Sequence, residues 1–483
     1  MAKSDSTGVA FVTWPTAPFT QSLVLRAVQR LDPSPTVVAS LAEVGPNSKV
    51  LQWSTYDEMD HELTHTRRSS VMASSYVIRK ALIRKHFLSR TIHAYLTKNP
   101  ESILRDASPR TYEIEISYAD ELDEIFADEL YDLEQDLEEG RWWILKPGMA
   151  DRGNGIRLFN SKQSLTKIFE EFEDDGSEDE EKDVGTGVVT SQLRHFVVQE
   201  YIDRPLLLDP RERPIDSAYT VPDKLEGHKF HLRVYCVASG SLTLYLYDRI
   251  LALFSSVPYA PPKFTTDDDS LNLAPHLTNT SLQTHRGEEG VRLLDELVGC
   301  TILSGSDRSL SWDTAAATAF TQAHITDIIQ QMTKILEETF KAAMGNPIHF
   351  QPIPNAFELF GVDFLVQHNF GLLQNSDNLS PFTVKLLEVN AEPAIELTGP
   401  RLAWILEDLF VAMARRCVQP FFEEGSEAEE EDGAALTLKK TVEGVEGKRE
   451  RGAKDRESRA GTREHEGREA EHLITCLQEV RGG

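Results

Sequence analysis

Two stretches in the second half of the sequence decide its interpretation: FELFGVDFLVQ at residues 357–367 and VKLLEVNAEP at residues 384–393. Both are runs of largely apolar residues with the length of a strand, which predicts two β-strands. Asp363 interrupts the first strand, where an unpaired charge would be costly. In the second strand, Glu388 and Asn390 stand two positions apart and therefore share one face.

If these two strands are neighbours, three oxygen-bearing side chains converge. Mg²⁺ binds one or two carboxylates and completes its octahedron with phosphate oxygens and water. Asp363, Glu388 and Asn390 are therefore predicted metal ligands. Leu387 and Val389, on the other face, are expected to point into the core. The alternative is a buried carboxylate that is paired with an arginine or a lysine.

A glycine-rich loop follows another predicted strand in WWILKPGMADRGNGIRLF, residues 142–159. The closely spaced glycines of residues 151–155 would let backbone N–H groups approach phosphate oxygens. Lys146 would supply a point charge, and Arg152 a forked donor, to the same phosphates. The loop is not a Walker motif, because G-x-x-x-x-G-K-[ST] is absent. The alternative is a hairpin turn with a surface lysine.

The stretch FVVQEYIDRPLLL, residues 196–208, predicts a buried strand that ends in the turn Gln199-Glu200-Tyr201-Ile202. Backbone groups and apolar side chains at such a strand end suit an adenine ring. An edge strand that leads into a loop is the alternative interpretation.

Three cations alternate in GHKFHLRVYCV, residues 227–237. On a strand, Lys229, His231 and Arg233 would all point to one face. Like charges repel, and an anion such as a triphosphate would resolve that repulsion. An exposed basic strand is the alternative.

Composition limits the function classes. The chain has 483 residues, a formal net charge of −28, 40% hydrophobic residues and four isolated cysteines. These values predict a soluble protein of a reducing cytoplasm, without a disulfide framework or a zinc site. The acidic balance argues against nucleic-acid binding. No apolar run is long enough for a membrane span, and no secretory signal is recognised. Residues 67–110 carry a local charge of +8, which suggests either an acidic partner or a solvated helix face.

The order of apolar patterns predicts an α/β protein of several lobes. Strands are expected near Val9–Trp14 and Thr36–Ala39, a basic helix pair over residues 74–97, and a long helix over about 314–343. Acidic residues 173–190 are expected to be a flexible insertion. The predicted parts are an N-terminal α/β lobe with basic helices, a central lobe, a C-terminal lobe with the metal site, and a disordered charged tail with a possible short helix at its end, at residues 1–108, 109–222, 223–421 and 422–483.

At these motifs the chain resembles the tubulin–tyrosine ligase family of the ATP-grasp superfamily, and most of all its fungal branch. The matching stretches span about residues 76–418 and are, in order, IRKALI, WILKPGMADRGNGI, VVQEYIDRPLLL, HKFHLR, PHLTN, FELFGVDFLV and LLEVNAEPA. The resemblance implies an ATP-grasp fold of α+β lobes and the cofactors ATP and Mg²⁺.

The resemblance also assigns roles to individual positions. The implied nucleotide-binding residues are Lys80, Lys146, Arg152, Gly153, Asn154, Gly155, Gln199, Glu200, Tyr201, Ile202, Lys229, His231, Thr278 and Asn279. Lys146, Arg233 and Arg249 would stabilise the transferring phosphoryl group, and Asp363, Glu388 and Asn390 would bind Mg²⁺.

Two positions depart from the family pattern. His231 stands where the family usually has an aspartate that is associated with the ribose. Leu253 of YDRILALFS stands at about the position of an arginine taken to grip the carboxylate of the incoming amino acid. Arg249, four residues earlier, could replace that arginine only after a shift in strand register.

The expected activity is ATP-dependent ligation of an amino acid, tyrosine by resemblance, to a carboxylate of an acidic protein tail such as that of tubulin. A glutamate or glycine ligase is the nearest alternative. The other is a non-catalytic nucleotide-binding scaffold in cytoplasmic ribonucleoprotein granules, such as processing bodies. A cytoplasmic monomer that uses a free amino acid and binds neither membrane nor nucleic acid is expected.

Overall fold

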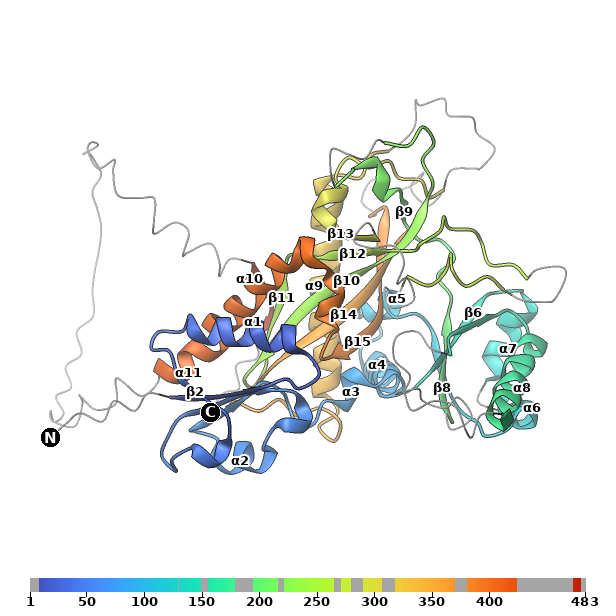
Figure 1. Ribbon diagram of the computed structural model, residues 1–483. Coiled ribbons are helices and arrows are strands. Elements are labelled where there is room, and N and C mark those ends of the chain that lie inside the picture. The colour runs from blue at the N-terminus through green and yellow to red at the C-terminus, as the bar shows by residue number, and fades with distance from the viewer. Residues whose placement is uncertain are drawn as a thin grey trace, which may run out of the picture. The chain divides into compact units, whose positions relative to one another are not determined.

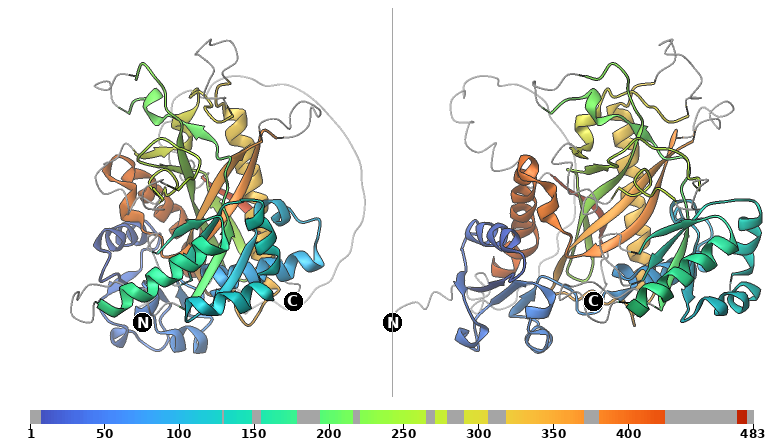
Figure 2. Two further views of the ribbon diagram at one scale, coloured as in Figure 1. Left: turned by 90° about the vertical axis from the view of Figure 1, so that its right-hand side faces the viewer. Right: turned by 45° about the vertical axis from the view of Figure 1, so that its right-hand side comes forward.

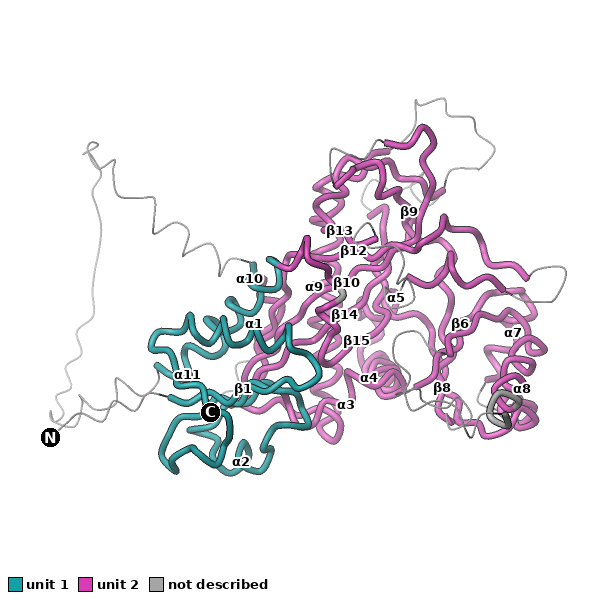
Figure 3. Tube along the Cα trace, viewed as in Figure 1, with its two compact units in different colours: residues 1–74, 404–473 teal, residues 75–403, 474–483 magenta. Residues whose placement is uncertain are grey.

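A computed structural model describes residues 8–128, 130–148, 155–178, 194–215, 221–264, 271–278, 290–305, 318–369, 380–423 and 472–478. The chain divides into two compact units (Figure 3). One unit consists of residues 1–74 and 404–473, and the other of residues 75–403 and 474–483. The basic helices, which were predicted to belong to the N-terminal lobe, belong to the second unit. The lobe boundaries predicted from the sequence stay a proposal.

The first unit is built on a parallel sheet in the order β2–β1–β3–β4. Its elements are β1 (Val9–Thr13), α1 (Pro18–Gln29), β2 (Thr36–Val38), β3 (Val50–Ser54), α2 (His61–Thr66), β4 (Val71–Ala73), α10 (Ala403–Met413) and α11 (Gln419–Glu423). The ring of Trp53 on β3 stacks on Phe410 of α10, with ring centroids 5.9 Å apart. Segments from both ends of the chain therefore share one core, and the two predicted N-terminal strands are confirmed.

The second unit contains a larger sheet around the long strand β10 (Figure 1). Its strands are β9 (Leu207–Leu208), β10 (His228–Ser239), β11 (Thr243–Tyr247), β12 (Leu251–Phe254), β13 (Val291–Leu293), β14 (Phe357–His368), β15 (Phe382–Ala391) and β16 (Leu473–Gln478). Strand β14 lies antiparallel between β10 and β15. The prediction that the two polar-bearing strands are neighbours is therefore confirmed.

A smaller antiparallel sheet of the same unit has the order β5–β8–β6–β7. It consists of β5 (Thr111–Glu115), β6 (Trp143–Pro147), β7 (Arg157–Phe159) and β8 (His195–Glu200), with α6 (Leu122–Ala127), α7 (Tyr131–Glu138) and α8 (Lys162–Glu178) beside it (Figure 2). Side chains such as Leu133, Phe169 and Phe196 form the core between these helices and the sheet. Because its inner face is apolar, this sheet can hold Lys146 and Gln199 at a fixed place.

The second unit also contains four helices: α3 (Lys80–Ile83), α4 (Lys85–Lys98), α5 (Leu104–Ala107) and α9 (Gln322–Met344). Helices α3 and α5 contact β15 of the larger sheet, whereas α4 contacts β5 and β8 of the smaller sheet. Helix α9 packs against α4 and β15. It begins after Thr321, whose side chain accepts a hydrogen bond from His324 N, while the His324 ring bonds back to Thr321 N. This reciprocal cap fixes where the helix starts. The predicted long helix is confirmed from residue 322 onward.

The end of the chain differs from the expectation. A short helix was possible there, whereas Leu473–Gln478 form strand β16 beside β11. The sequence LITCLQ is rich in β-branched and apolar residues, which favour a strand. Most of the predicted tail and of the acidic insertion lies outside the described residues. None of the described helices combines the length and the apolarity needed to cross a bilayer.

Candidate functional site

Strand β10 presents its three predicted cations to one side of the sheet. Lys229 and His231 are buried, with 6% and 5% of their surfaces exposed. Arg233 follows at the next position on the same face and pairs across the strands with Asp363 of β14. The alternative of an exposed basic strand is therefore wrong.

Asp363 is held by Arg233 through two hydrogen bonds. Arg233 Nη2 lies 2.9 Å from Asp363 Oδ2, and Arg233 Nε donates to Oδ1. Burial alone would lower the pKa of Arg233, but the charge of Asp363 outweighs it and raises that pKa. The predicted alternative, a buried carboxylate paired with arginine, is thus present, and burial of Asp363 does not by itself require a metal.

A β-bulge places the second carboxylate opposite the first. Asp363 pairs with Glu388, but the next residue, Phe364, pairs with Leu386, so Leu387 is the extra residue. Bulges re-aim side chains at functional sites. Here Leu387 lines a cavity rather than the core, which corrects the expectation for that residue, whereas Val389 is buried as predicted.

The three predicted metal ligands converge. Asn390 Nδ2 lies 3.2 Å from Glu388 Oε1 and 3.5 Å from Asp363 Oδ2. Burial would raise the pKa of Glu388, but the charges of Lys85 and Lys146 lower it, so its carboxylate is anionic. Two carboxylates and an amide oxygen are hard ligands that fit Mg²⁺. No cluster of three His, Cys, Asp or Glu side chains suited to a metal occurs among the described residues, as expected when one ligand is an asparagine.

Lys146 reaches the same region from the smaller sheet. It lies on β6, is 8% exposed, and its Nζ donates to Gln199 Oε1 at 2.7 Å. Burial lowers the pKa of Lys146 to about 8, against the opposing effect of Glu388. The alternative of a surface lysine on a hairpin is therefore wrong.

Lys229 has no carboxylate at ion-pair distance within the described part of the chain. Its Nζ lies 3.4 Å from the hydroxyl of Tyr201 and 4.5 Å from the centroid of that ring. Burial, together with the charge of Lys146, lowers the pKa of Lys229 to about 7. Two buried ammonium groups, one of which lowers the pKa of the other, have the charge that would suit an anion.

Side chains of the PHLTN segment contact both the turn after β8 and strand β10. His276 Nδ1 lies 2.8 Å from the Tyr201 hydroxyl, and Thr278 Oγ1 lies 2.6 Å from His231 Nδ1. Burial and Lys229 lower the pKa of His276 to about 4, so this ring is neutral. The predicted pocket residues Tyr201, His231 and Thr278 are thus brought together.

The remaining predicted residues have different surroundings. Ile202 is buried beside Tyr201, whereas the Glu200 carboxylate points to Arg110, with Glu200 Oε2 3.8 Å from Arg110 Nε. Gly155, the last residue of the predicted loop, has a left-handed φ of 70°. Lys80 is exposed at the start of α3. Arg249 precedes β12, with its Nε 3.9 Å from Asp248 Oδ1. Arg152, Gly153, Asn154 and Asn279 lie outside the described residues.

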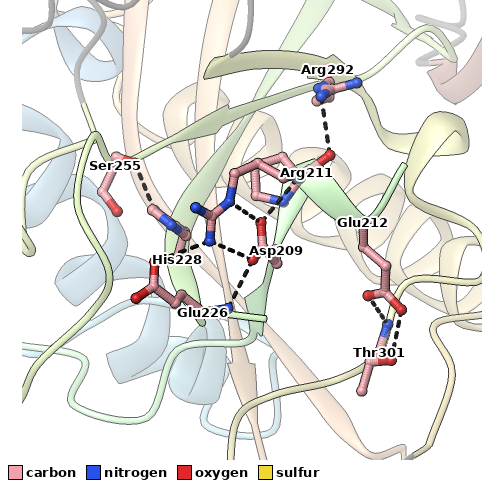
Figure 4. Close-up of polar contacts among 9 residues, drawn as sticks. Asp209, Arg211, Glu212, Glu226, His228, Ser255, Arg292 and Thr301 are labelled. Atoms are coloured by element: carbon pink, nitrogen blue, oxygen red, sulfur yellow. Dashed lines mark hydrogen bonds and ion pairs between the residues drawn. The ribbon is translucent and has the colours of Figure 1, made fainter. Parts of the chain in front are cut away.

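A polar network anchors the start of β10 (Figure 4). The fully buried Asp209 accepts hydrogen bonds from Arg211 Nε at 2.9 Å and from the backbone N–H of Glu226 at 2.8 Å. Burial would raise the pKa of Asp209, but Arg211 and these N–H groups lower it. Because β9 pairs with His228 and Lys229 immediately beside this network, it fixes the position of Lys229.

Comparison with known proteins identifies the family. The sequence model of the tubulin-tyrosine ligase family matches residues 62–426. The chain belongs to the tubulin-tyrosine ligase family. It is 36% identical over 422 residues to "Probable tubulin--tyrosine ligase PBY1" of Saccharomyces cerevisiae, covering 82% of this chain and 50% of that protein. It is also 36% identical over 411 residues to "Probable tubulin--tyrosine ligase C12B10.04" of Schizosaccharomyces pombe, covering 81% of this chain and 88% of that protein.

A solved structure shows the fold. The C-terminal domain of Pby1 from K. lactis, described as an ATP-grasp enzyme that interacts with the mRNA decapping enzyme Dcp2, is 31% identical with a TM-score of 0.59. The match covers 86% of this chain and 94% of that domain. The predicted ATP-grasp fold is therefore confirmed. The chain spans only half the length of the S. cerevisiae relative.

The two departures from the pattern of the tubulin-tyrosine ligase family lie side by side. His231 on β10 is the cross-strand partner of Leu253 on β12, and the register is regular from Phe230 to Arg233. The register shift that would bring Arg249 to the position of Leu253 is thus not observed. His231 Nε2 lies 3.9 Å from Asp363 Oδ1, and burial lowers the pKa of this imidazole. This part of the site therefore carries fewer charged groups than the family pattern, with its aspartate and arginine, predicts.

Sequence reasoning missed two residues of this tubulin-tyrosine ligase family site. Lys85 Nζ lies 3.5 Å from Glu388 Oε2, and His276 contacts Tyr201. Lys85 was recognised only as one of ten cations in residues 67–110. Its distance from Glu388 along the chain leaves no local signal. His276 belongs to the PHLTN stretch, which pointed to Thr278 instead.

Proposed function

We propose that this chain is an ATP- and Mg²⁺-dependent ligase that joins an amino acid to a carboxylate of an acidic protein tail. The observation that carries the proposal is the pair of buried lysines, Lys146 and Lys229, opposite the carboxylates of Asp363 and Glu388. Such a site offers cations to phosphate oxygens and anions to a divalent metal at once. Neither a surface hairpin nor a solvated strand would gather these four groups.

The reaction needs charge neutralisation more than a protein nucleophile. A carboxylate oxygen of the acceptor attacks the γ-phosphorus of ATP, and ADP leaves with the electrons of the broken P–O bond. The amine of the amino acid then attacks the acyl carbon, phosphate leaves, and the amine loses a proton to solvent. Mg²⁺ held by Asp363, Glu388 and Asn390 would neutralise phosphate charge. Lys146 and Arg233 would stabilise the transferring group.

The proposed identities of the amino acid and of the acceptor are inferred from membership of the family. Tyrosine is the amino acid, and the tubulin tail the acceptor, that family membership suggests. The charge of +8 over residues 67–110 complements an acidic tail. Leu253, in place of a carboxylate-binding arginine, favours testing glutamate and glycine beside tyrosine. The soluble and cytoplasmic character predicted from the composition belongs to the same proposal.

One incubation tests the ligase. The pure protein is mixed with Mg·ATP, each amino acid in turn, and a detyrosinated tubulin-tail peptide, and the product is weighed by mass spectrometry. We expect a mass increase equal to one amino-acid residue with tyrosine. An increase with glutamate or glycine instead would assign the alternative ligase. No increase with any amino acid would contradict the ligase on this acceptor.

A second candidate is a nucleotide-binding scaffold in processing bodies. It is favoured by the His231–Leu253 pair and by the K. lactis relative, which interacts with the decapping enzyme Dcp2. Calorimetry that shows Mg·ATP binding, together with co-precipitation of the decapping enzyme and no ligation, would support it. The complete set of Asp363, Glu388 and Asn390 favours the ligase, because a scaffold that only binds nucleotide does not require all three metal ligands.

Binding of Mg·ATP should be accompanied by proton uptake at alkaline pH. In the free protein, Lys229 has its pKa lowered to about 7 and Lys146 to about 8. Phosphate charge raises both pKa values, so between pH 8 and pH 9 binding should take up about one to two protons. At pH 6 both lysines already carry their protons, and the uptake should vanish. Calorimetry in two buffers of different ionisation enthalpy measures this number.

The control is Lys229→Met, which should reduce the uptake at pH 8.5 by about one proton. An unchanged proton number in this variant would show that Lys229 does not face the phosphates.

A further inference from the structure

The imidazole of His231 has one ring nitrogen with a hydrogen-bond partner and one without. Its Nδ1 lies 2.6 Å from Thr278 Oγ1. Its Nε2 is buried and has no hydrogen-bond partner within the described part of the chain. Asp363 Oδ1 lies 3.9 Å from this nitrogen, which is beyond hydrogen-bond distance. Because a buried polar atom without a partner is costly, Nε2 requires a partner that the described residues do not supply.

The neighbours of the ring decide which nitrogen carries the proton. If Nδ1 carried the only proton, the lone pair of Nε2 would face the carboxylate of Asp363 and be repelled by it. With the proton on Nε2, its positive end faces the carboxylate, and the Thr278 hydroxyl donates to Nδ1. A doubly protonated ring also carries a proton on Nε2. His231 therefore presents a hydrogen-bond donor at Nε2 whether the ring is neutral or charged.

The side chains around His231 do not compete for this donor. Arg233 can only donate hydrogen bonds, and it is bound to Asp363 through two of them. Leu253, the cross-strand partner on β12, has no polar atom in its side chain. The aspartate that the tubulin-tyrosine ligase family usually has at this position could only accept hydrogen bonds. His231 therefore reverses the hydrogen-bonding polarity of this position.

The position of His231 indicates what its partner is. Lys229, two residues earlier on the same face of β10, is a buried ammonium suited to an anion. Asp363, on the other side, is a predicted Mg²⁺ ligand. A nucleotide bound between these groups brings oxygen atoms of two kinds into this region, those of the sugar hydroxyls and those of the phosphates. Both kinds can accept a hydrogen bond from an N–H group.

We propose that His231 recognises the nucleotide by donating a hydrogen bond from Nε2 to one of its oxygens, while Thr278 holds the ring in the required orientation. This inference rests on the proposed function and deepens it, because it assigns a role to a position at which the chain departs from its family. A site with this donor selects an oxygen that accepts, whereas an aspartate selects a hydroxyl that donates.

Calorimetry with four nucleotides tests the role of His231 and identifies the oxygen. ATP, 2′-deoxy-ATP, 3′-deoxy-ATP and ADP are titrated into the wild type, His231→Leu and His231→Gln. Leucine removes the donor, whereas glutamine offers an amide N–H in its place. We expect His231→Leu to bind ATP about five- to tenfold more weakly than the wild type, and His231→Gln to recover most of this loss.

The pattern of the loss names the acceptor. If a sugar hydroxyl accepts the bond, the loss is absent with the deoxy analogue that lacks this hydroxyl. If the γ-phosphate accepts it, the loss is absent with ADP. A loss that is equal for all four nucleotides assigns an oxygen that they share, such as those of the α- and β-phosphates. Each titration is made in Mg²⁺ and in EDTA, because a loss that persists in EDTA does not act through the metal at Asp363.

The control is His368→Leu. His368 Nδ1 also contacts a hydroxyl, with Ser304 Oγ at 2.7 Å, but this residue lies on the face of β14 opposite to Asp363. All nucleotide affinities should therefore stay as in the wild type. Nitrogen NMR of histidine-labelled protein should place a proton on Nε2 of His231, whose signal is identified by its absence from His231→Gln.

Two results would overturn the role of His231: an Nε2 without a proton, or a His231→Leu variant that binds ATP as tightly as the wild type does. A wild type that binds none of the nucleotides would contradict the proposed ligase as well. The two failures are therefore distinguishable, because wild-type affinity for ATP is measured in the same experiment.

Discussion

Replacement of Glu388 by glutamine should abolish the Mg²⁺ dependence of nucleotide binding and lower ATP turnover by about 100-fold or more. Glu388 lies opposite Asp363, contacts Lys85 and Asn390, and has its pKa lowered by the lysines around it. Glutamine keeps the size of the side chain but removes the charge that a divalent cation requires. It also removes the negative charge that lies 3.5 Å from Lys85 and that raises the pKa of Lys146.

The two effects can be separated by calorimetry with ATP in Mg²⁺ and in EDTA. We expect the variant to bind metal-free ATP at least as tightly as the wild type does, because its site has gained positive charge, and to gain no affinity when Mg²⁺ is added. Glu337→Gln is the matched control, since this carboxylate pairs with Lys341 on the surface of α9. A Glu388→Gln variant with the Mg²⁺ dependence and turnover of the wild type would disprove the metal site.

The parts of the site that could be predicted are those in which a polar residue interrupts an apolar strand. Asp363 stood out because burial of an unpaired charge is costly. The shared strand face of Glu388 and Asn390, and that of Lys229 and Arg233, followed from strand geometry. Such features depend on a few neighbouring residues, so the sequence displays them. The strands β1 and β2 of the first unit and the helix α9 could be predicted for the same reason.

The remaining features depend on residues that are distant along the chain. The ion pair of Lys85 with Glu388 and the contact of Tyr201 with His276 follow only from the way in which the two sheets and α4 pack. The bulge at Leu387 arises because Phe364 pairs with Leu386, and no local sequence pattern encodes this pairing. Strands β11 and β16 are neighbours in the sheet but lie far apart along the chain, so the partner of β16 could not be named from the sequence.

Replacement of Arg79 by methionine should destabilise the folded protein by about 3–5 kcal/mol at pH 8. Arg79 Nε lies 3.0 Å from Glu358 Oε1, and the two side chains are only 9% and 4% exposed. Glu358 also accepts a hydrogen bond from the backbone N–H of Tyr76 at 3.1 Å. This pair fastens the segment before α3 to β14, five residues before Asp363. Without Arg79, β14 would carry an uncompensated buried anion.

The pH dependence of this loss is the sharper test. Burial raises the pKa of Glu358 to about 7 in the wild type, although Arg79 acts in the opposite direction. A carboxyl whose pKa is raised on folding binds its proton more tightly in the folded state, and this stabilises the folded protein at low pH. The stabilisation is lost as pH rises through about 7. Removing Arg79 raises that pKa further, so the destabilisation should be smaller at pH 5, where Glu358 binds a proton, than at pH 8.

Urea unfolding at both pH values measures the difference. The control is Glu407→Gln, which breaks the exposed pair with Arg26 and should lower the free energy of unfolding by less than about 1 kcal/mol. An Arg79→Met loss equal at the two pH values would show that Glu358 is not the group left uncompensated.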